Sequence, residues 1–273
     1  KSYNNNLGVN LSLANLDFDS PISILEIGTN KFGEIAQLTK LVKPHIAIIT
    51  NIGPVHLKNF NNIRNVVKEK SDIFNYKYNP DLQSIIIPYY LKEENYISQK
   101  VNENKNCKIL SFGNDKKADI FINDLKRIND EKFLTEVKIF NKKFKYEISA
   151  KGEHQVINSL ITLLIFHILD IKIENFKKNA TSLPELSGRG KIHCLLLNKK
   201  NIILIDESYN ASPLSMKETI KYFNNYSKNS NYKKYLILGD MLELGDKEIF
   251  FHSEIKKYLN YNSFYQVLTL GSL

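Results

Sequence analysis

Apolar runs alternate with amphipathic patterns along the first hundred residues of the chain. The apolar runs predict buried strands at residues 22–27, 45–50 and 84–88. Between and after them, apolar residues at helical spacing predict helices at residues 33–42, 61–76 and 91–101. Strands that are separated by helices usually pair in parallel. The sequence therefore predicts an α/β fold with a mostly parallel, doubly wound sheet.

The pattern changes between residues 108 and 150, where shorter strands with alternating polarity are predicted. Two of them, at residues 133–140 and 143–148, flank an Asn-Lys turn, which predicts an antiparallel patch beside the parallel sheet. A long apolar helix at about residues 153–169 then closes this domain.

Proline and glycine cluster at residues 182–190, which we interpret as a linker. The residues that follow predict strands at 191–197, 201–205 and 235–238 and near Val267, with helices that start at Pro213 and Asp246. The sequence thus predicts two domains, at residues 1–186 and 187–273, the second a truncated Rossmann-like α/β domain.

Polar residues follow several predicted strands at their carboxyl ends, where open α/β sheets bind ligands. Glu26 ends one run, and His56 follows the next run after a Gly-Pro turn. A carboxylate and a neutral imidazole that meet at this edge could hold a divalent cation. From these residues alone, a helix-capping or ion-paired Glu26 and a structural His56 stay open alternatives. The run at residues 204–207 is likewise predicted to be a buried parallel strand that delivers Asp206 and Glu207 to the edge.

Composition excludes several classes of protein. The net charge of +9 raises the question of a nucleic-acid partner, but arginine occurs only three times and the lysines are scattered among Asn and Glu. Cys107 and Cys194 lack the spacing of a metal site and fit a reducing compartment. The longest apolar stretch, residues 160–171, is shorter than the roughly 20 residues that span a bilayer. We expect a cytoplasmic protein that binds neither nucleic acid nor membrane.

Four motifs in the first half of the chain resemble, in order and spacing, the central domain of the Mur ligase family. They are Asn-Asn-Asn-Leu-Gly-Val at residues 4–9, Glu-Ile-Gly at 26–28, Thr-Asn-Ile-Gly-Pro-Val-His-Leu at 50–57 and Lys-Ser-Asp-Ile at 70–73. The resemblance implies an ATP-dependent ligase in which Glu26 and His56 take part in binding two Mg²⁺ ions. It also implies that CO₂ carbamylates Lys70, which converts an ammonium into a carboxylate-like group suited to a metal site. Lys68 is the neighbour that could be mistaken for it.

Motifs later in the chain extend the resemblance to the nucleotide. Residues 152–158 resemble a helix start whose asparagine helps to hold ATP, so this role is inherited by Asn158. Gly188-Arg189 matches the entry to the family's third domain, where the arginine approaches the phosphates. Asp206, Glu207 and Asn210 are also implied in nucleotide binding, and which of the two acids contacts the nucleotide is left open.

Two further motifs, Tyr-Asn-Ala at residues 209–211 and Gly-Asp-Met at 239–241, are similar to one branch of the family. This branch joins D-alanyl-D-alanine to a UDP-N-acetylmuramoyl-tripeptide in peptidoglycan synthesis. The resemblance implies that ATP phosphorylates the tripeptide carboxylate, that the dipeptide amine attacks the acyl phosphate, and that Lys70, His56 and Arg189 are catalytic. It also implies a monomer. The alternatives are the ligase that adds the third peptide residue, a folylpolyglutamate synthetase, or a non-catalytic nucleotide-binding relative.

A phosphate-binding Gly-x-x-x-x-Gly-Lys-[Ser/Thr] loop is absent from the sequence, which begins with Lys1 and ends at Leu273. We therefore expect the chain to be a piece of a longer protein. By itself it is expected to neither hydrolyse ATP nor ligate substrates, and to be prone to aggregation through an unpaired sheet edge.

Overall fold

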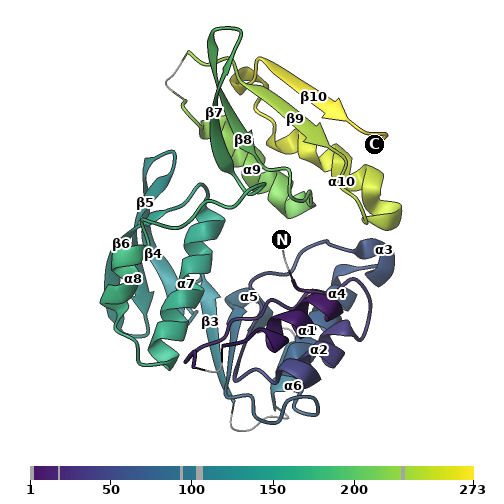
Figure 1. The fold of residues 1–273 in the computed structure, drawn as a ribbon, viewed down its shortest axis with the longest axis vertical. Helices are drawn as coiled ribbons and strands as arrows, with labels where there is room; N and C mark the ends of the chain where they lie inside the picture. Colours follow the sequence, from purple (N-terminus) through teal and green to yellow (C-terminus); the bar gives the residue numbers. More distant parts are fainter. Residues whose placement is uncertain (1–2, 18, 93–94, 103–106, 229–230) are drawn as a thin grey trace. The chain divides into compact units, whose positions relative to one another are not determined.

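The structure is a computed structural model that describes residues 3–17, 19–92, 95–102, 107–228 and 231–273. The chain divides into two compact units, Lys1–Asp119 and Ile120–Leu273 (Figure 1). Residues of each unit make most of their contacts within that unit. The domain boundary that the sequence predicts between residues 186 and 187 stays a prediction.

Three parallel strands form the centre of the first unit. β2 (Ser84–Pro88) pairs with β1 (Ile46–Ile48), placing Ile46 opposite Ser84, and with β3 (Lys108–Gly113), placing Ile85 opposite Ile109. All five residues of β2 are buried, which explains why its sequence is an uninterrupted apolar run rather than an alternating one. The strands predicted at residues 45–50 and 84–88 are confirmed.

Short helices precede β1 and connect the three strands (Figure 1). They are α1 (Asn6–Ala14), α2 (Glu34–Val42), α3 (Leu57–Phe60), α4 (Ile63–Lys70), the 3₁₀ turn η1 (Ser71–Phe74), α5 (Tyr89–Lys92) and α6 (Asn95–Asn102). The helix predicted at residues 33–42 is confirmed. The one predicted at 61–76 is in fact α4 followed by η1. The one predicted at 91–101 falls on α5 and α6, and residues 93–94 between them lie outside the described residues.

The strand predicted at residues 22–27 is wrong. This segment has no regular structure, and the side chain of Ile24 is 89% exposed. A strand needs a neighbour for its backbone ladder, and no strand in the described part of the chain pairs with this segment. Instead, the N–H of Gly28 donates to the carbonyl of Asn4 over 2.7 Å. Glu26 therefore lies in an irregular segment rather than at the end of a strand.

The second unit begins with an antiparallel meander of β4 (Ile120–Asn129), β5 (Lys132–Ile139) and β6 (Lys142–Ser149). Buried and part-buried residues alternate along β5, as expected of a sheet with one covered face. α7 (Glu153–Ile168) contacts β4, and α8 (Ile173–Asn179) contacts β6 (Figure 1). The predicted antiparallel patch and long helix are confirmed. β3 lies in the same predicted patch but pairs in parallel with β2, which corrects that part.

The rest of the second unit contains two small ladders. β7 (Lys191–Leu197) and β8 (Lys200–Asp206) are antiparallel, whereas β9 (Tyr235–Gly239) and β10 (Gln266–Leu270) are parallel. α9 (Pro213–Asn225) and α10 (Glu248–Ile255) enclose an apolar cluster with β9. The remaining short turns are η2 (Gly245–Lys247), η3 (Lys256–Tyr258) and η4 (Tyr261–Ser263).

The prediction of a buried parallel strand before Asp206 is wrong. β8 is antiparallel to β7, and the side chain of Leu204 is 47% exposed. The reason is the connection: Asn198 and Lys199 both have positive φ, at 48° and 61°. Two such residues form a tight turn whose twist suits a hairpin.

No helix in the described residues is long and apolar enough to cross a membrane.

Candidate functional site

In the first unit, the loop after β1 carries His56. The Val55 N–H donates to the Gly53 carbonyl over 2.9 Å, and His56 then adopts a left-handed conformation (φ 52°) at the start of α3. Such a conformation is uncommon for a residue other than glycine and costs about 1 kcal/mol or more. The turn thus fixes the backbone from which the His56 side chain extends.

Asn51 organises the same loop through both its side chain and its backbone. Its Oδ1 accepts hydrogen bonds from the Tyr90 hydroxyl (2.7 Å) and the Ile52 N–H (2.8 Å), and the Ile52 N–H also lies 3.1 Å from the Tyr90 oxygen. Asn51 follows β1 and Tyr90 follows β2, so the bonds join the carboxyl ends of two neighbouring parallel strands. Desolvation raises the pKa of Tyr90, which keeps the hydroxyl a donor.

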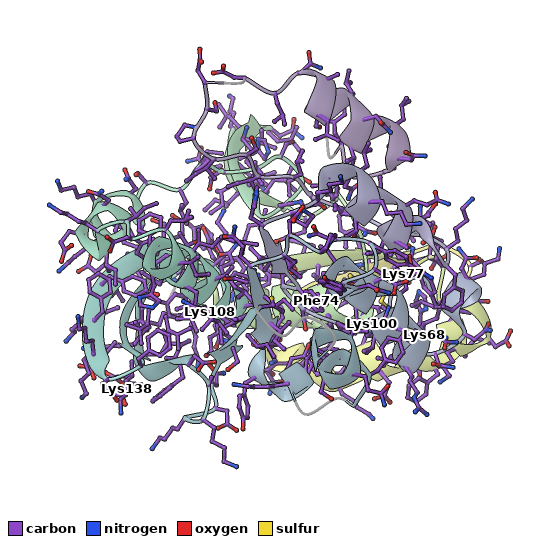
Figure 2. The ribbon with its side chains drawn as sticks, turned by 90° about the horizontal axis from the view of Figure 1, so that it is seen from below. Lys68, Phe74, Lys77, Lys100, Lys108 and Lys138 are labelled. Atoms are coloured by element: carbon purple, nitrogen blue, oxygen red, sulfur yellow. The ribbon has the colours of Figure 1, made fainter. Side chains whose placement is uncertain are left out.

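Lys70 reaches this loop from the last position of α4. Its Nζ lies 3.4 Å from the Asn51 carbonyl oxygen, and no described carboxylate forms an ion pair with it. Burial lowers the pKa of the Lys70 ammonium. Lys68, labelled in Figure 2, is exposed on the same helix. Lys68 and Lys70 are thus only two residues apart, but Lys68 is exposed whereas Lys70 is partly buried.

The carboxylate of Glu26 accepts a hydrogen bond from Asn4 Nδ2 over 2.8 Å. The loop that follows Glu26 is tied to the other two candidate segments. Asn59, just after His56, donates to the Asn30 carbonyl over 2.7 Å, and Glu69, next to Lys70, accepts from the Gly33 N–H over 2.8 Å. The structure therefore connects the three segments that carry the predicted metal ligands. That the three side chains surround one ion stays a prediction.

The described residues contain no group of three His, Cys, Asp or Glu side chains arranged to hold a metal ion. The predicted metal site therefore stays a prediction.

In the second unit, the carboxylate of Asp206 forms hydrogen bonds with nearby residues. Its carboxylate accepts from the Ser208 hydroxyl (2.6 Å), the Ser208 N–H (3.1 Å) and the Gly188 N–H (3.0 Å). The Ser208 hydrogen bonds, foremost that of the hydroxyl, hold the pKa of Asp206 below its usual value. For the adjacent Glu207, desolvation raises the pKa of the carboxyl group. The two acids thus differ, because Asp206 braces the loop whereas Glu207 does not.

Arg189 lies between two buried glycines in that loop, and its guanidinium stacks on the Tyr209 ring at 4.4 Å from the centroid. Gly188 has φ of 73°, and a Cβ there would lie 3.0 Å from the Tyr209 backbone nitrogen. Lys151 donates to Glu185 (2.9 Å) and also to the Gly190 carbonyl. The backbone is therefore clamped on both sides of Arg189 while its side chain stays exposed.

The other two residues predicted to bind the nucleotide, Asn158 and Asn210, are both exposed. Asn158 is exposed on α7, and Asn210 is exposed with its Oδ1 accepting from the Ala211 N–H over 2.8 Å. The structure groups Arg189, Asp206 and Glu207 through the loop at Gly188, but no hydrogen bond among the described residues joins Asn158 to them.

His252 closes the loop that follows β9. Its Nε2 accepts from the Met241 N–H over 2.9 Å, and its Nδ1 lies 2.7 Å from the Glu248 carbonyl oxygen, to which it must donate. The ring is therefore held as the neutral Nδ1–H tautomer. The sequence motif at residues 239–241 thus has a structural explanation, because His252 binds the backbone of Met241.

Sequence reasoning missed Asn51, Tyr90 and Glu69. A signal existed for Glu69: it is three residues after Val66, which is buried on the same helix, so helical spacing places it on the covered face. For Asn51 and Tyr90 the sequence shows only that each follows a predicted strand, because their contact depends on the register between β1 and β2.

Comparison with known proteins was made for both sequence and structure. The model of the Mur ligase middle domain matches residues 1–166. The UDP-N-acetylmuramoyl-tripeptide–D-alanyl-D-alanine ligase of Buchnera aphidicola subsp. Baizongia pistaciae is 33% identical over 100% of this chain and 56% of its own length. The same enzyme of Bacillus subtilis is 28% identical, again over 100% of this chain and 56% of its own length.

Solved structures show the same fold. MurF from Acinetobacter baumannii superposes with a TM-score of 0.83 at 24% identity, covering 100% of this chain and 56% of the other. MurF from Thermotoga maritima in complex with ADP gives 0.78 at 23% identity, covering 97% and 57%. The chain spans about half the length of these relatives. The predicted α/β fold class is confirmed.

Proposed function

Because this chain belongs to the Mur ligase family, we propose that the protein containing it joins D-alanyl-D-alanine to a UDP-N-acetylmuramoyl-tripeptide at the expense of ATP. The observation that carries the proposal is the match along the whole chain to curated ligases of this name, at up to 33% identity. The motifs at residues 209–211 and 239–241 lie in the matched region and beyond the middle domain.

The chemistry requires activation of a carboxylate. An oxygen of the tripeptide's terminal carboxylate attacks the γ-phosphorus of ATP, ADP leaves, and an acyl phosphate forms. The dipeptide amine then attacks the acyl carbon, and phosphate leaves as the amide bond forms and the amine loses its proton. Activation is needed because phosphate is a far better leaving group than oxide.

We propose Glu26, His56 and a carbamylated Lys70 as the magnesium-binding residues. The donor set fits only in that form, because an ammonium at Lys70 would repel the ions. The lowered pKa of Lys70 favours the modification, since CO₂ adds to the neutral amine and the product loses a proton to become a carbamate. Two Mg²⁺ ions bound there would supply positive charge toward the phosphates. We propose Lys70, His56 and Arg189 as the catalytic residues.

Nucleotide binding is proposed for Asn158, Arg189, Asp206, Glu207 and Asn210. The exposed Arg189 fork suits phosphate oxygens. Of the two acids, we assign direct nucleotide contact to Glu207, because Asp206 already accepts three hydrogen bonds from its own loop. Asp206 would then act by holding the Gly188 backbone in place.

The test is product analysis with defined substrates. The full-length protein that contains this chain is incubated with ATP, the UDP-linked tripeptide and D-alanyl-D-alanine, and the masses of the products are determined by mass spectrometry. The expected product is the tripeptide extended by the dipeptide, formed together with ADP and absent when ATP is omitted. A parallel reaction offers the UDP-linked dipeptide with single amino acids. Ligation only in that parallel reaction, or in neither, would overturn the proposal.

A further inference from the structure

Glu69 is a charged residue in an unusual position, because its side chain is only 1% exposed. Its carboxylate accepts hydrogen bonds from the Gly33 N–H (2.8 Å) and the Ile35 N–H (2.9 Å). The Thr29 hydroxyl is also within donor distance at 3.1 Å, and it shares its proton with the Lys31 carbonyl at 2.9 Å. A buried carboxylate is costly unless its oxygens are satisfied in this way. The hydrogen bonds therefore offset the cost of burying the Glu69 carboxylate in the first unit.

All three donors belong to the start of α2 or to the loop before it. α2 begins after Gly33, which has no side chain and leaves the helix without a cap of its own. Glu69 supplies that cap from α4, across 36 residues of chain, and its negative charge suits the positive end of the helix. The cap joins two elements that the local sequence does not connect.

The two ends of this connection both carry candidate site residues. On one side, the capped loop continues back to Glu26, and its Asn30 carbonyl accepts from Asn59, three residues after His56. On the other side, Glu69 directly precedes Lys70, the last residue of α4. Since neighbouring residues of a helix share a rigid backbone, fixing Glu69 also fixes the base of the Lys70 side chain.

We infer that Glu69 is a positioning residue, whose carboxylate caps α2 and thereby holds Lys70 in register with the loop that follows Glu26. The inference rests on the proposed function in one respect, namely that Lys70 carries the carbamate. It assigns no contact between Glu69 and substrate. Its consequence is that loss of the carboxylate should disturb Lys70 even though every atom of Lys70 is retained.

The experiment compares Glu69→Gln with Lys68→Gln, which changes an exposed residue of the same helix. Glutamine matches the shape of glutamate but presents an amide N–H₂ toward at least one backbone donor. Three properties are measured: hydrogen exchange in residues 29–36, the carbamate signal at Lys70 in ¹³C-bicarbonate, and the acylation rate of Lys70 relative to Lys68 or a distant lysine. A thermal melt confirms that each variant is folded.

For Glu69→Gln we expect hydrogen exchange in residues 29–36 to rise by about tenfold, as for loss of one good hydrogen bond. The carbamate signal should fall and the relative acylation rate of Lys70 should rise several-fold. Lys68→Gln should change none of these. Faster exchange with an unchanged carbamate signal and an unchanged Lys70 acylation rate would overturn the inference and leave Glu69 as a cap alone.

A second variant guards against a failure of Glu69→Gln to fold. Thr29→Val removes the hydroxyl with its contacts to Glu69 and to the Lys31 carbonyl but leaves the two backbone bonds to Glu69, so a smaller change in the same direction is expected. No change at Lys70 despite faster exchange would again contradict the inference. If the wild-type protein shows no carbamate, the proposed role of Lys70 fails, whereas the acylation rates still decide the role of Glu69.

Discussion

Lys68 and Lys70 show how much a shift of two positions on a helix changes a side chain. Lys70 follows the buried Val66 and Val67 by four and three residues, so it lies beside the covered face of α4, and Lys68 points to solvent. Only Lys70 reaches the loop after β1. The motif alone selected Lys70 by resemblance, and the helix geometry supplies the physical reason.

At this scale we predict that Lys70→Met stabilises the protein near neutral pH in buffer free of CO₂. Burial lowers the folded-state pKa of Lys70 below 10.5, so the unfolded state binds more protons between the two values. The charged lysine is therefore a penalty at low and neutral pH that fades as pH rises through this window. The gain in Tm over wild type should accordingly be largest below the folded pKa and vanish above about pH 10.5.

Lys68→Met is the control for that titration, because Lys68 is exposed and should show no such dependence on pH. A gain at Lys70 that persists unchanged at high pH, or a loss at neutral pH, would contradict the assignment of burial as the cause.

The sequence predicted the position of a residue in the fold where neighbouring residues in the chain determine it. His56 after a strand and Arg189 between glycines follow from neighbours in the chain. Asn51 and Tyr90 could not be predicted, because they are 39 residues apart and meet only through the pairing of β1 with β2. A contact that depends on the register between two strands can be predicted only when the pairing of those strands is known.

At the scale of elements, an apolar run predicts that a strand exists but not what it pairs with. The run at residues 201–205 is equally apolar whether buried in a parallel sheet or placed in a hairpin, and the turn at Asn198 and Lys199 decides for the hairpin. The run at residues 22–27 is also mostly apolar, and it finds no partner in the described part of the chain. By contrast, β2 and α7 match their predictions closely: β2 has a paired strand on each side, and α7 is a long helical pattern of 16 residues.

The start of α9 gives a test of a single element. Ser212 and Ser215 form a capping box, in which each side chain bonds to the backbone of the other residue. Ser212→Ala should cost about 1 kcal/mol of unfolding free energy, measured by urea denaturation.

The matched control is Ser253→Ala. Ser253 is an exposed serine of α10 whose hydroxyl donates back to the Phe250 carbonyl and caps no helix, so the change should be within about 0.5 kcal/mol of wild type. Equal effects of the two substitutions would show that the capping box contributes nothing specific.

For the whole molecule, charge and function must be reconciled, since a net charge of +9 is high for an enzyme that we propose binds no nucleic acid. The lysines lie on many different elements. Figure 2 labels Lys68 on α4, Lys108 on β3 and Lys138 on β5, among others. Scattered cations attract phosphate only generally, whereas a nucleic-acid site needs a continuous basic surface.

We therefore predict only weak binding of single-stranded RNA or duplex DNA, with Kd no tighter than about 10⁻⁶ M at physiological salt. Fluorescence anisotropy across a salt series measures it. Nanomolar binding that survives physiological salt would contradict the prediction and favour a nucleic-acid function.

Our main proposal is that the protein containing this chain is a ligase of the Mur family and that its activity depends on Lys70. The most direct test is the turnover number of ligation, followed as ADP formed with the UDP-linked tripeptide and D-alanyl-D-alanine, for Lys70→Ala beside Lys68→Ala. We predict that Lys70→Ala lowers kcat by at least about 100-fold, that added bicarbonate restores nothing, and that Lys68→Ala stays within about twofold of wild type. Equal losses in the two variants, or full turnover without Lys70, would contradict the account.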